Sequence, residues 1–107
     1  MAEDIVIKLT ADFFKTLAHP ARIQILHYLE NGELCVCDLL EKIDIEQSNL
    51  SQHLGMMKKQ GIIDSRKEGQ KVIYRIVYQS VMDVIGAAEK TLSEEISNSQ
   101  NILKFLK

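Results

Sequence analysis

Two short helical patterns separated by a tight turn constrain the fold of this chain more than any other feature. The first pattern covers about residues 36–43, and the second covers about residues 47–60. The second repeats its apolar side chains at i, i+4 and i+7, so they share one helical face: Leu50, Leu54 and Met57. Two short helices joined in this way form a helix-turn-helix. We therefore expect a helix-turn-helix over residues 36–60.

The hydrophobic period changes after Gly61, the residue that closes the second of these helices. Apolar residues then alternate with polar ones as far as Ile76, as they do in half-buried strands. Gly69 supplies a turn in the middle of this stretch. Residues 62–76 are therefore predicted to form a β-hairpin, or wing, with three basic residues near its tip: Arg66, Lys67 and Lys71.

Further helical stripes flank this unit. One covers residues 5–17 and ends near His19, because a residue that precedes a proline disfavours the helical region. Others cover residues 21–30 and 79–96. The resulting order, α-α-α-α-β-β-α, predicts a mainly helical winged helix-turn-helix fold.

The length of 107 residues fits a single domain, since domains usually take about 100–200 residues. We expect residues 1–107 to form one DNA-binding domain. The small core is not expected to absorb both terminal apolar stripes. Residues 5–17 and 79–106 are therefore predicted to be dimerisation helices, and the alternative is that both stripes cap the core of a monomer.

The net charge of −2, with a pI near 5.9, taken alone argues against nucleic-acid binding, because such domains often have a pI above about 9. The charge is unevenly distributed, however. Residues 1–46 carry a net charge of −5, residues 47–75 carry +4, and residues 76–107 carry −1. The positive charge is thus concentrated in the second helix of the helix-turn-helix and in the wing.

The second helix carries uncharged polar side chains on the side opposite its apolar face. Serine, asparagine and glutamine read base edges and contact phosphates, and lysine and arginine bind phosphates in a salt-dependent way. His53 borders the apolar face, so we expect a packing or phosphate-side role for it. The alternative is a solvated polar face beside an unrelated hairpin. The predicted contacts to double-stranded DNA are Gln47, Ser48, Asn49, Ser51, Gln52, His53, Lys58, Lys59, Arg66, Lys67 and Lys71.

No apolar run approaches the roughly 18–20 residues that a membrane span needs. The acidic first residues lack the basic region of a signal peptide. We therefore expect a cytoplasmic protein without a membrane partner.

The two cysteines, Cys35 and Cys37, lie only two positions apart. In a reducing compartment such a pair indicates metal binding or redox chemistry more than a structural disulfide. Side chains at i and i+2 of a regular helix point about 200° apart, so both sulfurs can reach one ion only where a helix begins and Cys35 is still extended. A helix N-terminus also favours the thiolate, and thiolates select soft ions such as arsenite, antimonite, cadmium, lead, zinc or copper(I).

Two alternatives remain for this pair. The cysteines can be two small apolar side chains, one of them buried. They can also sense redox state, by forming a disulfide with each other, a persulfide bridge, or a disulfide with a small thiol.

The chain resembles the ArsR/SmtB, or arsenical-repressor, family of metal-responsive winged-helix repressors. The residues that carry the resemblance lie at 17–26, 33–39, 47–54 and 66–69. The resemblance implies a homodimer that binds operator DNA through residues 47–59 and represses transcription. It also implies release from the operator when a soft ion binds Cys35 and Cys37, with arsenite or antimonite favoured over cadmium, lead or zinc.

The chain departs from the family pattern in two places. Leu40 occupies the position at which some arsenite sensors have a third cysteine. A third ligand must therefore come from solvent, an exogenous thiol, or a side chain such as Asp38 or His19. The last helix carries carboxylates but no histidine, so it lacks part of the other metal site of the family.

The sequence holds no constellation typical of an enzyme. It has no Ser/His/Asp arrangement, no paired carboxylates at a catalytic spacing and no glycine-rich phosphate loop. We expect neither an enzyme nor an organic cofactor. A metal-buffering or redox protein is the less favoured alternative function.

Overall fold

The computed structural model describes residues 2–97. The predicted dimerisation segment 79–106 therefore extends beyond the described residues. Five helices and three strands follow one another in these residues. Their bounds are α1 Ala2–Leu17, α2 Pro20–Leu29, β1 Leu34–Cys35, α3 Val36–Lys42, α4 Gln47–Lys59, β2 Ile63–Glu68, β3 Lys71–Ile76 and α5 Ser80–Ser97.

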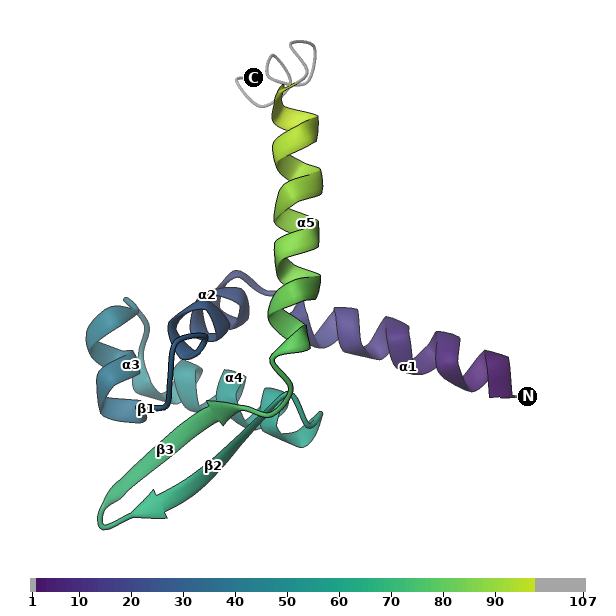
Figure 1. Cartoon of the computed structure of the whole chain (residues 1–107). Helices are drawn as coiled ribbons and strands as arrows, with labels where there is room; N and C mark the ends of the chain where they lie inside the picture. The colour runs from purple at the N-terminus through teal and green to yellow at the C-terminus, as the bar shows by residue number, and fades with distance from the viewer. Residues whose placement is uncertain (1, 98–107) are drawn as a thin grey trace.

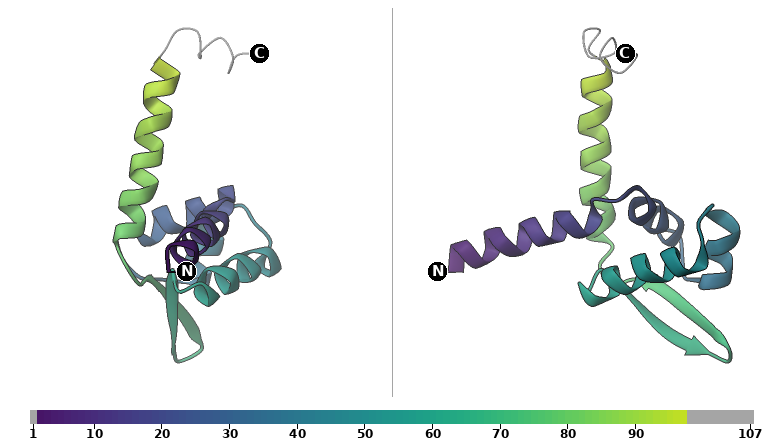
Figure 2. Two further views of the ribbon diagram at one scale, coloured as in Figure 1. Left: turned by 90° about the vertical axis from the view of Figure 1, so that its right-hand side faces the viewer. Right: turned by 180° about the vertical axis from the view of Figure 1, so that it is seen from behind.

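Helices α2, α3 and α4 pack together with the sheet, and the β2–β3 hairpin extends away from them (Figure 1). Helices α1 and α5 leave this body in two different directions, as both views in Figure 2 show. The winged helix-turn-helix order predicted from the sequence is confirmed. The observed helices match the predicted ranges 5–17, 21–30, 36–43, 47–60 and 79–96 to within one residue at each end, except that α1 begins three residues earlier than predicted.

The sheet has a third strand that the hydrophobic period did not reveal. Its order is β1-β3-β2, and both strand pairs are antiparallel. In the register, Ile73 of β3 pairs with Cys35 on one side and with Arg66 on the other. Strand β1 contains only two residues, too few for an alternation to be detected. It nevertheless places Cys35 and Arg66 on one line across the sheet.

Helices α2, α3 and α4 meet the sheet and the start of α5 in a single apolar core. The predicted inward face of α4 is confirmed, because Leu50, Leu54 and Met57 are fully buried. Full burial of such a side chain stabilises a fold by roughly 1.5–3 kcal/mol. The largest fully buried side chains are Ile25, Leu26, Leu29, Leu39, Leu50, Leu54, Met57 and Ile63.

The helix-turn-helix and the wing end at residues whose backbone fits those turns. His19 caps α2, with its Nδ1 accepting the Ala21 N–H at 3.2 Å, and Pro20 takes the first helical position. Gly61, after α4, and Gly69, in the two-residue turn between β2 and β3, have φ values of 78° and 64°. Only glycine adopts such angles without a steric cost.

Most of α1 makes no contact with this core. Of its residues only Thr16 and Leu17 are buried, although Phe13 packs partly against the core. Its apolar side chains instead face solvent, as do two on α5: Ile5, Val6, Ile7, Leu9, Phe14, Leu92 and Ile96. The alternative in which both stripes cap the core applies only to the ends nearest to it, because Leu17 of α1 and Val81 and Ile85 of α5 are buried there.

No helix among residues 2–97 is both long enough and apolar enough to cross a membrane.

Candidate nucleic-acid interface and cysteine site

Helix α4 presents a continuous polar surface to solvent. Ser48, Asn49, Ser51 and Gln52 are exposed there, as is Gln47 at its first position. The same helix buries its apolar side chains in the core, so the polar face is held at a fixed orientation. A helix with such a face can enter a major groove, which is about 12 Å wide. The predicted base-reading residues are thus brought together.

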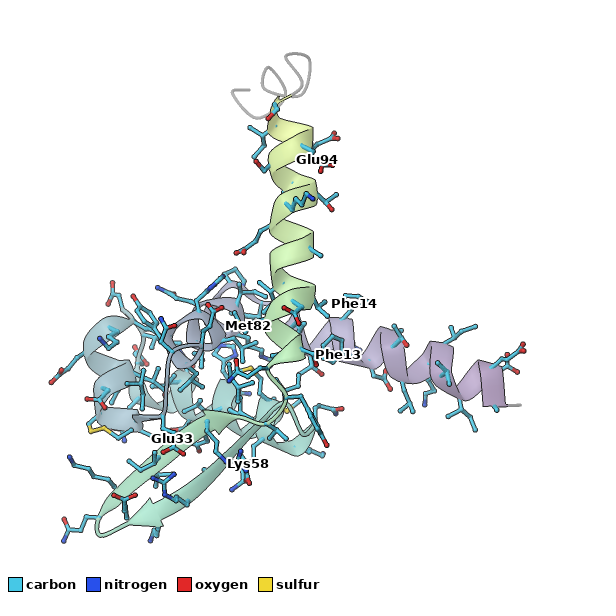
Figure 3. The ribbon with its side chains drawn as sticks, in the orientation of Figure 1. Phe13, Phe14, Glu33, Lys58, Met82 and Glu94 are labelled. Carbon is cyan, nitrogen blue, oxygen red and sulfur yellow. A yellow bond between two sulfur atoms is a disulfide. The ribbon has the colours of Figure 1, made fainter. Side chains whose placement is uncertain are left out.

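The predicted basic residues lie in the last turn of α4 and on the wing, and they differ in their contacts. The Lys58 ammonium, at the end of α4, donates to Ser65 Oγ of β2 at 2.8 Å, which joins the helix to the wing. Figure 3 labels Lys58 beside the hairpin. Lys59, Lys67 and Lys71 are exposed and have no ion pair within residues 2–97. These three ammonium groups are open to phosphates.

Arg66 is held by two carboxylates. Its Nη1 donates to Glu33 Oε2 at 2.5 Å, and its Nη2 and Nε donate to Glu68 Oε2 at 2.7 and 3.0 Å. The hydrogen bond from Arg66 holds the pKa of the Glu33 carboxyl below its ordinary value. Glu33 precedes β1 and lies near the hairpin (Figure 3). Sequence reasoning missed Glu33, because no local pattern indicates that residue 33 reaches a strand 33 positions later.

His53 faces inward from α4 and contacts two residues around the start of α2. Arg22 Nε donates to His53 Nδ1 at 3.1 Å, and the rings of His53 and His19 lie with centroids 4.2 Å apart. Arg22 also donates to the Thr16 carbonyl at 3.0 Å. Burial lowers the pKa of His53 below its ordinary value of 6.5, and the nearby charges of His19 and Arg22 lower it further. This half-buried position fits the packing role expected for His53.

The pKa shift of His53 predicts a pH-dependent stability. Because this pKa is lower in the folded state, the unfolded chain binds more protons below pH 6.5. The contribution of His53 to the free energy of unfolding should thus be retained above about pH 6.5 and be lost progressively as the pH falls below it. Urea unfolding at a series of pH values, with wild type compared with His53→Gln, isolates this group from His19 and His27. Parallel pH profiles for the two proteins would contradict the assignment.

The two sulfurs lie where β1 ends and α3 begins. Cys35 is the N-cap of α3, with extended backbone (φ −79°, ψ 165°). The condition predicted for a shared site, an extended Cys35 at a helix start, is therefore met. Cys35 Sγ accepts the Asp38 N–H at 3.1 Å, and Asp38 Oδ2 accepts the Cys35 N–H at 3.2 Å. Cys35 is 3% exposed, whereas Cys37 is solvent-exposed.

Cys35 and Cys37 are joined by a disulfide, visible as the yellow bond in Figure 3. Their Cα atoms are 5.2 Å apart. This bond is the oxidised form of the pair, and two-electron reduction would release both thiols. The structure therefore holds the pair in one of the states that the redox alternative requires, while metal binding requires the reduced state.

The residues around the sulfurs fit a soft ion once the pair is reduced. One ligand atom each from Cys35, Cys37 and Asp38 lies within 4.8 Å of the others. This donor set contains two thiolates and one carboxylate. Of the two candidate third ligands on the chain, Asp38 lies at the site, and His19 lies instead against His53.

Comparison with known proteins gives a consistent result. The model of the bacterial regulatory protein family arsR matches residues 19–65. The HTH-type transcriptional regulator Rv0081 of Mycobacterium tuberculosis is 38% identical to this chain, and the alignment covers 100% of this chain and 95% of that protein. Its crystal structure gives a TM-score of 0.79 at 40% identity, over 88% of this chain and 95% of that chain.

Two further proteins are similar to this chain over a large part of its length. The cadmium resistance transcriptional regulatory protein CadC of Listeria innocua is 39% identical, over 68% of this chain and 62% of CadC. The solution structure of the homodimeric winged helix-turn-helix DNA-binding domain of Mb0332 from Mycobacterium bovis gives a TM-score of 0.77 at 26% identity, over 88% of this chain and 87% of that chain. From its fold, its helix-turn-helix and these relatives, the chain belongs to the ArsR family of DNA-binding transcriptional regulators.

Proposed function

We propose that this protein is a homodimeric repressor that binds operator DNA when its cysteine site is empty and reduced, and that leaves DNA when a thiophilic ion binds Cys35 and Cys37. One observation carries the regulatory part of this proposal. Cys35 belongs at once to the wing sheet, through its pairing with Ile73, and to the start of α3, which it caps. A change in the bonding of the Cys35 sulfur can therefore alter the position of both the wing sheet and α3.

The DNA contacts follow from the exposed polar face of α4 and the basic wing. Gln47, Ser48, Asn49, Ser51 and Gln52 read bases or position the helix in the major groove. The lysines and Arg66 contact phosphates. His53 packs against His19 and Arg22 and so holds α4 in its orientation. The proposed phosphate contacts are Lys58, Lys59, Arg66, Lys67 and Lys71.

The homodimer is supported by the apolar surface that the monomer leaves open. Phe14 of α1 and Leu92 of α5 are 53% and 55% exposed. They also line an apolar cleft between α1, α2 and α5 with a volume of about 400 Å³. One recognition helix reads few bases, and dimers solve this by reading two half-sites one helical turn apart. We infer that α1 and α5 of two protomers pack together.

When bound, the ion would link two thiolates, which is the ligand type that arsenite, antimonite, cadmium, lead and zinc share. Cys35, Cys37 and Asp38 would hold it. Asp38 Oδ2 accepts the Cys35 N–H in this structure, and this is one of the two reciprocal hydrogen bonds that cap α3. If the carboxylate turned toward an ion, this hydrogen bond would be lost. If the ion favours a shape that fits DNA poorly, then ion and DNA weaken each other by the same coupling free energy, typically about 1–3 kcal/mol.

The disulfide favours a second candidate function, in which the same repressor senses thiol oxidation or persulfide. Mass spectrometry after mild oxidation detects the disulfide or a persulfide bridge. Titration of the reduced protein with metal salts detects thiolate-to-metal absorption. A response in the first measurement without one in the second would favour redox sensing.

DNA binding itself is tested by a gel shift with the protein and the DNA upstream of its own coding region. The reduced protein should retard this DNA at low salt, and addition of metal salts should reverse the shift. The absence of any shift at low salt would contradict the repressor proposal.

The Glu33–Arg66 ion pair yields a separate prediction. Replacing Glu33 with glutamine removes one carboxylate from Arg66 and makes its guanidinium more available to a phosphate. DNA affinity should then rise, and the slope of log K against log salt should steepen by up to about 0.9 for each additional phosphate that the protein neutralises. Fluorescence anisotropy at several salt concentrations measures both quantities.

Glu41→Gln is the matched control, since it removes the same charge from an exposed position on α3 that makes no contact with Arg66. Equal steepening in the Glu33 and Glu41 variants would show that net charge, rather than release of Arg66, causes the effect.

A further inference from the structure

A cleft of about 400 Å³ opens beside the cysteine pair on the proposed DNA-binding side of the molecule. Cys35 and Cys37 line one wall, Gln47 and Ser51 of α4 line another, and the wing contributes Lys71. Ligand sites typically have volumes of about 300–1,000 Å³, so the cleft can take a molecule of the size of a short peptide. Three of these residues, Gln47, Ser51 and Lys71, are also proposed DNA contacts.

The two sulfurs facing this cleft differ in access. Cys35 is 3% exposed, and Cys37 is open to solvent. Thiol–disulfide exchange depends on which sulfur a thiolate can reach. An incoming thiolate therefore attacks the sulfur of Cys37. The sulfur of Cys35 is then the leaving group in this step and the attacking group in the reverse step.

The charge at the rim selects the type of thiol. Lys71 is exposed and has no ion pair within the described residues. Apart from this ammonium, the cleft is lined by uncharged polar, apolar and sulfur-bearing side chains. A small thiol that carries carboxylates finds an opposite charge there, whereas a cationic thiol does not.

We propose that Cys37 is the site of a reversible mixed disulfide with a small anionic thiol, and that the attached group fills the cleft and excludes DNA. This proposal rests on the redox form of the proposed function. It differs from a shape change transmitted through the fold, because the adduct itself occupies the space between α4 and the wing. Bound DNA must then shield Cys37 in return.

The exchange is balanced without a further reagent. The thiolate of the small thiol attacks Cys37 Sγ, the bond between the two cysteines breaks, and Cys35 leaves as a thiolate with the bonding electron pair. Attack by the Cys35 thiolate on the mixed disulfide reverses the step and releases the small thiolate. Replacing Cys35 with serine removes this reverse reaction and traps the adduct.

The test uses the full chain as the Cys35→Ser variant, reduced and then treated with oxidised glutathione. The Cys37 thiolate attacks one sulfur of the reagent, and the second glutathione leaves as a thiolate. Mass spectrometry should show one glutathione per chain. The Cys37→Ser variant, which retains only the buried Cys35, should react at least about tenfold more slowly, because exchange requires access to the thiolate. Equal rates would overturn the assignment of Cys37.

DNA binding of the same preparation tests the exclusion. Glutathionylated Cys35→Ser should bind operator DNA at least about tenfold more weakly than the untreated variant, and saturating DNA should slow the labelling of Cys37 by reciprocal linkage. The small methylthio adduct, which leaves most of the cleft empty, is the control and should weaken binding less than twofold. Unchanged DNA affinity after glutathionylation, or equal loss with both adducts, would overturn the exclusion.

Lys71→Gln, introduced into Cys35→Ser, tests the preference for an anionic thiol. Reaction with oxidised glutathione should slow, and reaction with oxidised cysteamine, which is cationic, should not. Slowing with both reagents would overturn the role of Lys71. If untreated, reduced wild type binds no DNA at low salt, the proposed function fails. The labelling rates of Cys37 measured without DNA do not depend on that result, so the two failures can be told apart.

Discussion

Replacing Asn49 and Gln52 together with alanine is expected to abolish the preference for operator over unrelated DNA. Both side chains are exposed on the polar face of α4, and amides of this kind form bidentate hydrogen bonds to adenine. Each such pair contributes about 1–3 kcal/mol of discrimination, so loss of the pairs in both half-sites should reduce operator affinity at least about 100-fold. Anisotropy titrations with operator and scrambled DNA measure the ratio. Thermal unfolding should change little, since exposed substitutions usually alter stability by less than about 0.5 kcal/mol.

Lys59→Gln is the contrasting variant for this experiment. Lys59 is exposed at the end of α4 and is a proposed phosphate contact, so its loss should weaken binding to operator and scrambled DNA by similar factors. If the Asn49 and Gln52 double variant behaved in this uniform way, α4 would not be the element that reads sequence.

Introducing a carboxylate on the open face of α1, as in Phe14→Glu, is expected to dissociate the dimer and to weaken operator binding at least about 100-fold. Phe14 is 53% exposed, so its replacement leaves no cavity in the monomer core. A dimer interface at this position, however, would have to bury the new carboxylate. Loss of the second half-site removes the avidity of two linked contacts, which reaches factors of about 10²–10⁴. Analytical ultracentrifugation gives the mass, and anisotropy gives the affinity.

Lys15→Glu serves as the control because it places a carboxylate on the charged side of the same helix, next to Phe14 in sequence. It should leave the protein dimeric. A Phe14→Glu protein that remained dimeric would show that α1 lies outside the interface.

The fold was predictable because its helices are long enough for their period to be detected and end at residues with specific backbone preferences. Leu50, Leu54 and Met57 indicated the inner face of α4. The proline after His19 marked the end of α1, and Gly61 marked the end of α4. The winged order followed from the change of period after Gly61. These signals depend only on neighbouring residues in the sequence, so they can be read without knowledge of tertiary contacts.

The contacts that connect the site to the fold were not predictable in the same way. Strand β1 has two residues, Glu33 reaches Arg66 across the sheet, and Arg22 reaches His53 from another helix. Each contact joins positions more than 30 residues apart or lies in an element too short to show a period. Sequence spacing alone predicted that Cys35 and Cys37 share a site and allowed one of them to be buried, but it did not indicate which one.

Control of DNA binding by the cysteine pair is tested by a comparison of wild type with a variant that lacks both sulfurs. Wild type and the Cys35→Ser/Cys37→Ser variant are both reduced and bound to fluorescent operator DNA. One sample of each protein is titrated with arsenite, and another is titrated with cadmium. Wild type should lose affinity by a factor of about 5–150 with at least one ion, while the double variant should bind DNA and keep its affinity throughout. Equal release of the double variant by the same ion would show that Cys35 and Cys37 do not control DNA binding.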